Sequence, residues 1–246
     1  MEAGRKQQLT AGAPTRAAAL RDIHGHKRVN DILLGPLERP ALRWLSAHMP
    51  AWMTPDLLTA IGVLGALLIM VSYALSALDR GFLWLASAGY LVNWFGDSLD
   101  GTLARYRNIE RPKYGFFLDH TVDAVTQAII ILGIGLTPYV NFTVTALLLI
   151  TYLMLSVIAY VRTCVTGEFR ISYGRLGPTE VRVIALMLNA AMFFFGAVTY
   201  SVTIFGSKVI MFTPYDIGVA TIGFLLFSFF LHTAWKEGRQ LAASGE

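Results

Sequence analysis

Six apolar segments, separated by short polar stretches, run through most of the sequence. Each is close to the roughly 20 residues that an α-helix needs to cross a bilayer. The segments are Leu57–Leu78, Phe82–Leu103, Gly115–Leu136, Thr143–Val165, Val183–Phe205 and Ile217–Thr233. Charged residues make up 15% of the chain, whereas soluble domains carry about 25%. We therefore predict a single-domain, all-α integral membrane protein with six transmembrane helices.

The lysine and arginine residues are distributed unequally between the two ends of the predicted helices. Two of the 20, Arg80 and Lys208, lie in the first and fifth connections, and the others lie on the opposite side or near it. Since cytoplasmic loops of membrane proteins carry an excess of these residues, we predict that both termini face the cytoplasm. The net charge of +4 then reflects topology, not a nucleic-acid partner. We expect the membrane to be a bacterial inner or cell membrane.

The stretch before the first predicted span mixes leucine and tryptophan with arginine. Between Val29 and His48 this pattern predicts an amphipathic helix on the cytoplasmic leaflet, which Pro36 and Pro40 either interrupt or start. The single cysteine, Cys164, excludes an intrachain disulfide and a cysteine-based zinc site. The predicted organisation is a polar cytoplasmic segment at 1–28 without a signal peptide, a membrane domain at 29–236 and a cytoplasmic tail at 237–246.

Four aspartates, Asp97, Asp100, Asp119 and Asp123, lie within or beside the second and third apolar segments. An ionisable side chain costs at least about 2.5 kcal/mol at the bilayer centre, so such residues are candidates for function. The spacings D-x-x-D and D-x-x-x-D place each pair on one helix face, and the predicted topology places all four near the cytoplasmic surface. Carboxylates gathered in this way predict a pair of divalent cations, Mg²⁺ or Mn²⁺.

The residues between the two aspartate pairs suit a phosphate-bearing ligand. Gly101 and Ala104 have almost no side chain, so a ligand can lie directly against the helix there. Arg105 offers a two-pronged donor for phosphate. Two metal ions about 3.5–4 Å apart suit phosphoryl transfer, because they stabilise both the attacking and the leaving oxygen.

This stretch resembles the signature of the CDP-alcohol phosphotransferase family, D-x2-D-G-x2-A-R-x8–9-G-x3-D-x3-D, and has every fixed position. The resemblance implies transfer of a substituted phosphate from a CDP-linked donor to an alcohol with release of CMP, one substrate being a lipid. It implies that Asp97, Asp100 and Asp119 bind metal and that Asp123 is a ligand or the base. The implied nucleotide-binding residues are Gly101, Ala104, Arg105 and Gly115. It also implies a homodimer.

Two further motifs resemble different branches of this family. His120, in D-H-x-x-D, and Glu180, in G-P-x-E, resemble the choline and ethanolamine phosphotransferases, with CDP-choline or CDP-ethanolamine as donor. There His120 would be a general base that Glu180 orients. The short chain with six spans instead resembles enzymes whose donor is CDP-diacylglycerol. In that case Arg170, Arg175 and Arg182 would bind an anionic acceptor.

Alternative interpretations remain for several of these residues. His120 is also compatible with a hydrogen-bonded interior residue, Glu180 with an ion pair to Arg175 or Arg182, and the arginines with attraction to the inner leaflet. A cation or proton transporter also places carboxylates in a membrane, but along its whole depth. An intramembrane prenyltransferase-like enzyme also uses two aspartate motifs, but lacks the D-G-x-x-A-R core.

Overall fold

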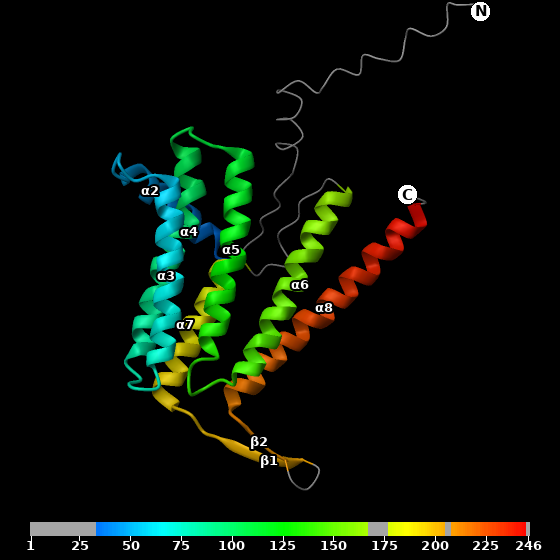
Figure 1. The fold of residues 1–246 in the computed structure, drawn as a ribbon. Helices are drawn as coiled ribbons and strands as arrows, with labels where there is room; N and C mark the ends of the chain where they lie inside the picture. Colours follow the sequence, from blue (N-terminus) through cyan, green and yellow to red (C-terminus); the bar gives the residue numbers. More distant parts are fainter. Residues whose placement is uncertain (1–32, 167–176, 205–207, 245–246) are drawn as a thin grey trace, which may run out of the picture.

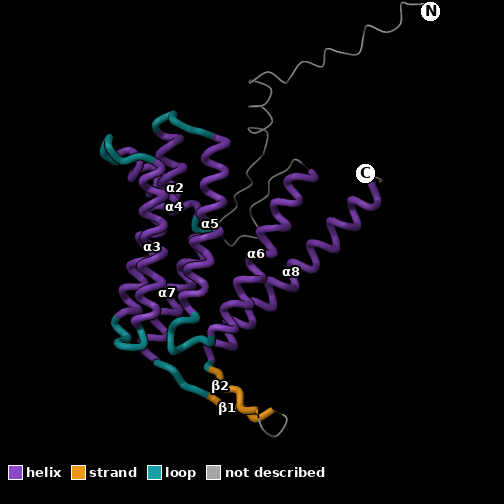
Figure 2. Tube along the Cα trace, in the orientation of Figure 1, coloured by secondary structure: helices purple, strands orange, loops and turns teal. Residues whose placement is uncertain are grey.

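The structure is a computed structural model that describes residues 33–166, 177–204 and 208–244. In these ranges the chain is mostly helical, with a short antiparallel hairpin between the last two helices (Figure 1, Figure 2). The elements are α2 (Gly35–His48), α3 (Pro55–Leu75), α4 (Phe82–Tyr106), α5 (Pro112–Ile134), α6 (Phe142–Thr166), α7 (Pro178–Phe195), β1 (Tyr200–Ile204), β2 (Lys208–Phe212) and α8 (Pro214–Ser244). The predicted segment 1–28 lies outside the described residues.

Proline marks the beginning of several helices. Pro55, Pro112 and Pro178 are the first residues of α3, α5 and α7, where the missing N–H would have no partner inside the helix anyway. The side chain of Thr54 caps α3 by accepting a hydrogen bond from the backbone N–H of Leu57 at 3.2 Å. In α2, Pro36 is the second residue and marks the start of the helix, whereas Pro40 lies inside the helix without interrupting it.

The helices form two groups that meet at one end. Helices α3, α4, α5 and α7 pack side by side, whereas α6 and α8 pair with each other and diverge from the bundle (Figure 1). Helix α3 packs closely on α4 through glycines: a Cβ added at Gly96 would lie 2.3 Å from the backbone nitrogen of Gly62. Small residues allow this approach, which is how helices associate where the surrounding lipid is as apolar as they are.

Helix α2 packs on the ends of α3 and α4. Its Leu42 joins a buried cluster with Leu58 of α3 and with Leu99 and Leu103 of α4. The guanidinium of Arg107, just after α4, donates hydrogen bonds to the carbonyl oxygens of the α2–α3 connection, residues Met49, Pro50 and Met53, at 3.0, 2.8 and 2.6 Å. Thus α2 and the α4–α5 connection lie at one end of the bundle, and the hairpin lies at the other (Figure 1).

The fifth predicted span differs most from the structure. The prediction was a helix over Val183–Phe205, but α7 begins at Pro178 and ends at Phe195. Gly196 follows with a φ of +67°, which side-chain-bearing residues rarely adopt. The next residues include Val202, Thr203 and Ile204, whose branched side chains favour strands, and they pair with β2. The last part of the expected helix is therefore replaced by one strand of a short hairpin, while its first part forms α7 and the fold stays mostly helical.

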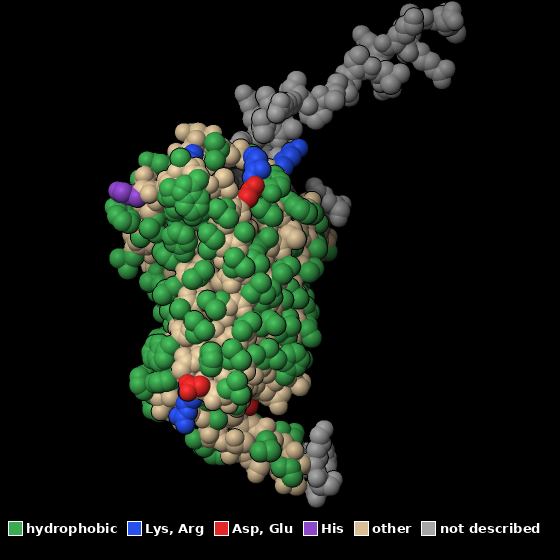
Figure 3. Space-filling model, turned by 60° about the vertical axis from the view of Figure 1, so that its left-hand side comes forward, with side chains coloured by type: hydrophobic (Ala, Val, Ile, Leu, Met, Phe, Trp, Pro, Cys, Tyr) green, Lys and Arg blue, Asp and Glu red, His purple; other side chains and the backbone are tan. Residues whose placement is uncertain are grey.

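Five of the described helices are long and apolar enough to cross a membrane: α3, α5, α6, α7 and α8. Helix α4, the second predicted span, is 25 residues long but carries Asn93, Asp97 and Asp100 and is not among the five. On the face shown in Figure 3, hydrophobic side chains cover the middle of the molecule and charged ones gather near its two ends. This distribution fits an integral membrane protein. Helix α8 continues past its predicted span, to Ser244.

Candidate active site

Three carboxylates from two helices meet at the α2 end of the bundle. Asp97 comes from the second half of α4, and Asp119 and Asp123 come from α5, four residues apart on one face. Each contributes one oxygen to a group whose members all lie within 4.8 Å of one another. All three residues are partly exposed. Oxygen ligands at this mutual distance fit a hard divalent cation such as Mg²⁺ or Mn²⁺.

The fourth predicted aspartate, Asp100, is held beside this group by α3. One of its carboxylate oxygens accepts a hydrogen bond from the hydroxyl of Thr59 at 2.6 Å, and the other accepts one from the backbone N–H of Gly101 at 2.5 Å. Asp100 is not one of the three clustered carboxylates. Its charge still interacts with those of Asp97 and Asp119. The structure therefore brings three of the four predicted residues together and attaches the fourth to a neighbouring helix.

A buried arginine from α7 supplies positive charge to the cluster. Arg182 forms an ion pair with Asp97, and its Nε donates a hydrogen bond to the side-chain oxygen of Asn93 at 3.1 Å. Asn93 in turn donates to the carbonyl oxygen of Gly62 at 3.0 Å, which ties the arginine to α3. Arg182 is 8% exposed. A buried charge of this kind needs such a partner, because its separation from water is otherwise unfavourable.

His120 follows Asp119 and lies beside the cluster. Its ring stacks on Phe116 with the centroids 4.1 Å apart, and the ring of Tyr160 from α6 lies 5.7 Å away. The Nδ1 atom is 2.8 Å from the carbonyl oxygen of Phe116 and 3.7 Å from a carboxylate oxygen of Asp119. Because a carbonyl only accepts, Nδ1 carries hydrogen and Nε2 is the nitrogen that can take up a proton.

Glu180 is buried at the start of α7, and its contacts are with the backbone. One carboxylate oxygen accepts a hydrogen bond from the N–H of Leu34 at 2.7 Å, and the other accepts one from the N–H of Gly177 at 2.9 Å. Glu180 thereby caps its own helix and fastens the segment before α2 to it. Arg182 pairs with Asp97 and not with Glu180. These contacts are those of a positioning residue, and the orientation of His120 by Glu180 stays a prediction.

Glu38 of α2 is a site residue that sequence reasoning missed. A single carboxylate oxygen of Glu38 accepts hydrogen bonds from Trp94 and Ser98 of α4 at 2.8 and 3.3 Å and from the hydroxyl of Thr179 of α7 at 2.8 Å. Ser98 directly follows Asp97, so Glu38 holds α2 against the helix that carries the cluster. The sequence carried no signal for this role, because one acidic residue on a surface helix is ordinary.

We expect Glu38→Ala to lower the melting temperature of the detergent-solubilised protein by several degrees. The substitution leaves the partly buried donors of Trp94 and Thr179 without this acceptor, at a cost of up to about 1–3 kcal/mol for each. Glu38→Gln keeps an acceptor oxygen and should lose much less stability. Equal melting temperatures for the wild type and Glu38→Ala would contradict this role.

The predicted nucleotide-binding residues lie on the two helices that carry the aspartates. The guanidinium of Arg105 lies over Gly101, since a Cβ added at that glycine would be 3.3 Å from Nη1 of the arginine. Arg105 also donates to the hydroxyl of Thr102 at 3.3 Å. Gly115 faces open space, with nothing within 4 Å of an added Cβ. Ala104 is partly exposed. Two of the predicted acceptor residues, Arg170 and Arg175, lie outside the described residues.

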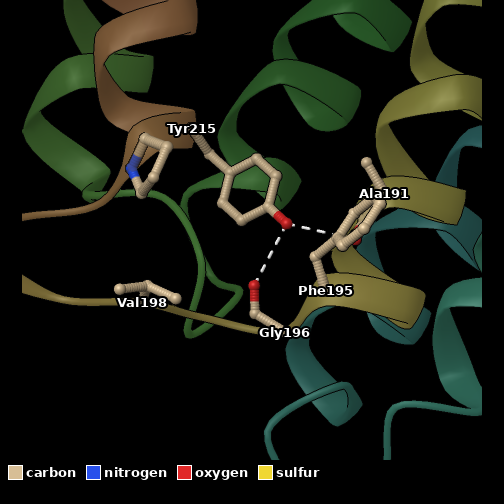
Figure 4. A pocket seen from close by; sticks show the side chains of 6 residues that line it. Ala191, Phe195, Gly196, Val198 and Tyr215 are labelled. Atoms are coloured by element: carbon tan, nitrogen blue, oxygen red, sulfur yellow. Dashed lines mark hydrogen bonds between the residues drawn. The ribbon is translucent and has the colours of Figure 1, made fainter.

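An apolar cavity of about 260 Å³ lies at the other end of α7, away from the carboxylates. Its lining includes Phe195, Val198 and Tyr215, and the hydroxyl of Tyr215 is 3.1 and 3.0 Å from the carbonyl oxygens of Ala191 and Gly196 (Figure 4). Thirteen residues of helix, roughly 20 Å, separate Arg182 from Phe195. The cavity is therefore separate from the acidic cluster, and its contacts join α7 to α8.

The bundle and its site define the class of protein. It is a helical membrane protein with a cluster of carboxylates at one end of its helices, and a buried arginine forms an ion pair with one of them. Comparison with known proteins identifies the family within this class. Residues 52–232, well over half of the chain, match the family described as CDP-alcohol phosphatidyltransferase. The chain belongs to this family, which confirms the resemblance seen in its aspartate motif.

Relatives in the family carry two kinds of name. Cholinephosphotransferase 1 of Mus musculus is 26% identical over 203 residues, which are 78% of this chain and 50% of the relative. Phosphatidylinositol phosphate synthase of Cutibacterium acnes is 38% identical over 90 residues, 37% of this chain and 41% of the relative. The chain thus spans about half the length of the cholinephosphotransferases that it matches.

Solved structures show the same fold. The phosphatidylinositol phosphate synthase of Mycobacterium tuberculosis with CDP-DAG bound superposes with a TM-score of 0.51 at 22% identity, over 80% of this chain and 92% of that one. The same enzyme in complex with manganese and citrate gives a TM-score of 0.51 at 23% identity, over 80% and 88%. At this level of identity the likeness concerns the arrangement of the helices.

Proposed function

We propose that the protein is a phospholipid-synthesis enzyme that transfers a substituted phosphate from a CDP-linked donor to an alcohol and releases CMP. The observation that carries this proposal is the meeting of Asp97, Asp119 and Asp123 within 4.8 Å, at the family's motif positions. Arg105 lies further along α4, the helix that carries Asp97. Family membership favours this reaction over the ion transporter and the prenyltransferase-like enzyme.

The clustered carboxylates suit divalent cations as the cofactor. Asp97, Asp119 and Asp123 would hold Mg²⁺ or Mn²⁺, with Asp100 as a fourth ligand and two ions in the site. When bound, the ions supply positive charge that stabilises the attacking and leaving oxygens of a phosphoryl transfer. The manganese complex of the Mycobacterium tuberculosis relative supports this choice of cation.

The protein's own residues would bind the donor and move one proton. Gly101, Ala104, Arg105 and Gly115 would line the cytidine diphosphate site, with the guanidinium of Arg105 on a phosphate. The acceptor hydroxyl forms a bond to the phosphorus of the substituted phosphate while the bond from that phosphorus to CMP breaks. The proton of the acceptor hydroxyl passes to a base, either Asp123 or Nε2 of His120.

The donor is CDP-diacylglycerol or a CDP-choline or CDP-ethanolamine type, so that donor or acceptor is a lipid. The D-H-x-x-D motif and the longer match to cholinephosphotransferases support a donor of the CDP-choline or CDP-ethanolamine type. The higher identity with the phosphatidylinositol phosphate synthase, over a shorter stretch, supports CDP-diacylglycerol as the donor. With an anionic acceptor, Arg182 would contact its phosphate together with the predicted residues Arg170 and Arg175.

For the membrane we propose six spans, with α4 as the sixth, and α2 on the cytoplasmic leaflet. Helix α4 has 25 residues, about 37 Å, and its polar side chains face α3 and α7. The distribution of lysine and arginine supports a cytoplasmic site and cytoplasmic termini, in a bacterial inner or cell membrane. We further propose a catalytic domain at 29–236 with a tail at 237–246, and a homodimer, which the family resemblance implies.

The test is a donor panel. Membranes that contain the protein receive Mn²⁺ or Mg²⁺, one of CDP-diacylglycerol, CDP-choline and CDP-ethanolamine, and a matching alcohol. We expect CMP release that depends on the cation and on one donor type, and removal of the cation with EDTA should abolish it. Failure of every donor to yield CMP above membranes without the protein would overturn the proposed function.

A further inference from the structure

The contacts of Arg182 leave part of its guanidinium unused. Its Nη2 pairs with Asp97 and its Nε donates to Asn93, but its Nη1 is buried and has no hydrogen-bond partner among the residues that the structure describes. The side chain is 10% exposed, so water does not replace the missing contact freely. Buried donors are normally satisfied, and an exception calls for a specific explanation. One explanation is that the pairing with Asp97 is one of two arrangements of this side chain.

Asp97 has two candidate positive partners. It is one of the three carboxylates that lie close enough together to hold a cation, and it is also the carboxylate that Arg182 contacts. Without a cation, the partly exposed carboxylates of Asp97, Asp119 and Asp123 repel one another, and the guanidinium offsets part of that charge. With a cation bound to the cluster, the guanidinium and the ion are two positive charges on one carboxylate, and they repel each other.

We propose that Arg182 is an internal cation that pairs with Asp97 until a divalent ion binds, and that it competes with this ion for the carboxylate. This inference rests on the proposed function, because it needs the cluster to bind a divalent ion. Arg182 is in this role a positioning residue: it keeps Asp97 in the cluster while the ion is absent. The opposite role, in which Arg182 only orients Asp97 as a ligand, predicts the opposite effect of its removal on metal affinity.

The experiment measures metal affinity directly. Wild type and Arg182→Gln are purified in detergent and titrated with Mn²⁺ without any nucleotide, and the free ion is followed by electron paramagnetic resonance. We expect Arg182→Gln to bind Mn²⁺ about tenfold more tightly, because a competing positive charge close to the ion is gone. Its melting temperature in EDTA should fall, and its gain on adding Mn²⁺ should exceed that of the wild type.

Two further variants keep the test decisive. Arg111→Gln removes another arginine–aspartate pair, with Asp56, and should leave the Mn²⁺ affinity unchanged. Arg182→Lys keeps the charge, so it should fold even if Arg182→Gln does not, but it loses the fork that bonds Asn93 and Asp97 together. We expect it to bind Mn²⁺ about threefold more tightly than the wild type. Unchanged or weaker Mn²⁺ binding by the folded Arg182 variants would overturn the proposal.

The result separates this inference from the proposed function. CMP release is measured on the same preparations. Tighter Mn²⁺ binding by the variants, with no CMP release from any donor by the wild type, would support the role of Arg182 and overturn the proposed transferase activity. CMP release by the wild type, with weaker Mn²⁺ binding by the variants, would support the activity and overturn the competition.

Discussion

Asp123→Asn is expected to reduce CMP release by a factor of at least about 10³, because a neutral amide does not replace a charged metal ligand and, in one of the two assignments, the base is lost as well. Asparagine has the size of aspartate but cannot take up a proton or carry charge. Asp123 lies among partly buried carboxylates, so its loss also relieves repulsion in the cluster. We therefore expect the variant to melt at the same temperature as the wild type in EDTA, or higher.

This combination, lost activity with unchanged or increased stability, distinguishes a functional residue from one that holds helices together. The matched control is Asp56→Asn, which breaks the pair with Arg111 on the surface and should change CMP release by less than about threefold, as exposed pairs contribute little. If Asp123→Asn retained a tenth or more of the activity, neither assignment of Asp123 would hold.

Gly96→Ala is expected to destabilise the protein by about 3 kcal/mol, the size of an overpacked core substitution. The added Cβ would lie 2.3 Å from the backbone nitrogen of Gly62 and 2.4 Å from the carbonyl oxygen of Leu58, so α3 and α4 would have to separate. Backbone atoms cannot rotate away as a side chain does. Because Asp97 is the next residue, CMP release should fall as well.

The control for this prediction has the opposite sign. Gly218 lies in α8, where an added Cβ meets nothing within 4 Å. Gly218→Ala should therefore be neutral or stabilise the protein by up to about 1 kcal/mol through helix propensity. Thermal unfolding in detergent measures both variants. Equal effects of the two substitutions would show that the close approach of α3 and α4 does not limit stability.

The helices were largely predictable from sequence because their signals are local. Apolar runs of the length of a bilayer identified α3, α4, α5, α6, α8 and the first part of α7. The end of α7 was not predictable in the same way. The stretch after Gly196 is apolar enough to continue a span, and hydropathy does not distinguish a branched-residue strand from a helix.

The candidate site was likewise predictable from sequence only in part. The aspartates and the family were predictable, because eight fixed residues at fixed spacing lie within 97–123 and the chain belongs to the family. The partners of those aspartates were not. Arg182 is 85 residues from Asp97, and Glu38 is 141 residues from Thr179. No local pattern records such pairs.

By itself, then, the sequence determined where most helices form and that α4 and α5 each carry two aspartates on one face, since periodicity and short motifs act within one or two turns. Tertiary structure alone decided that Asp100 binds Thr59 while Asp97 binds Arg182, and that Glu38 and Glu180 fasten α2 to α7. The physical reason is that these contacts depend on how closely and at what register the helices pack. At Gly96 that packing is set by the absence of a single carbon atom.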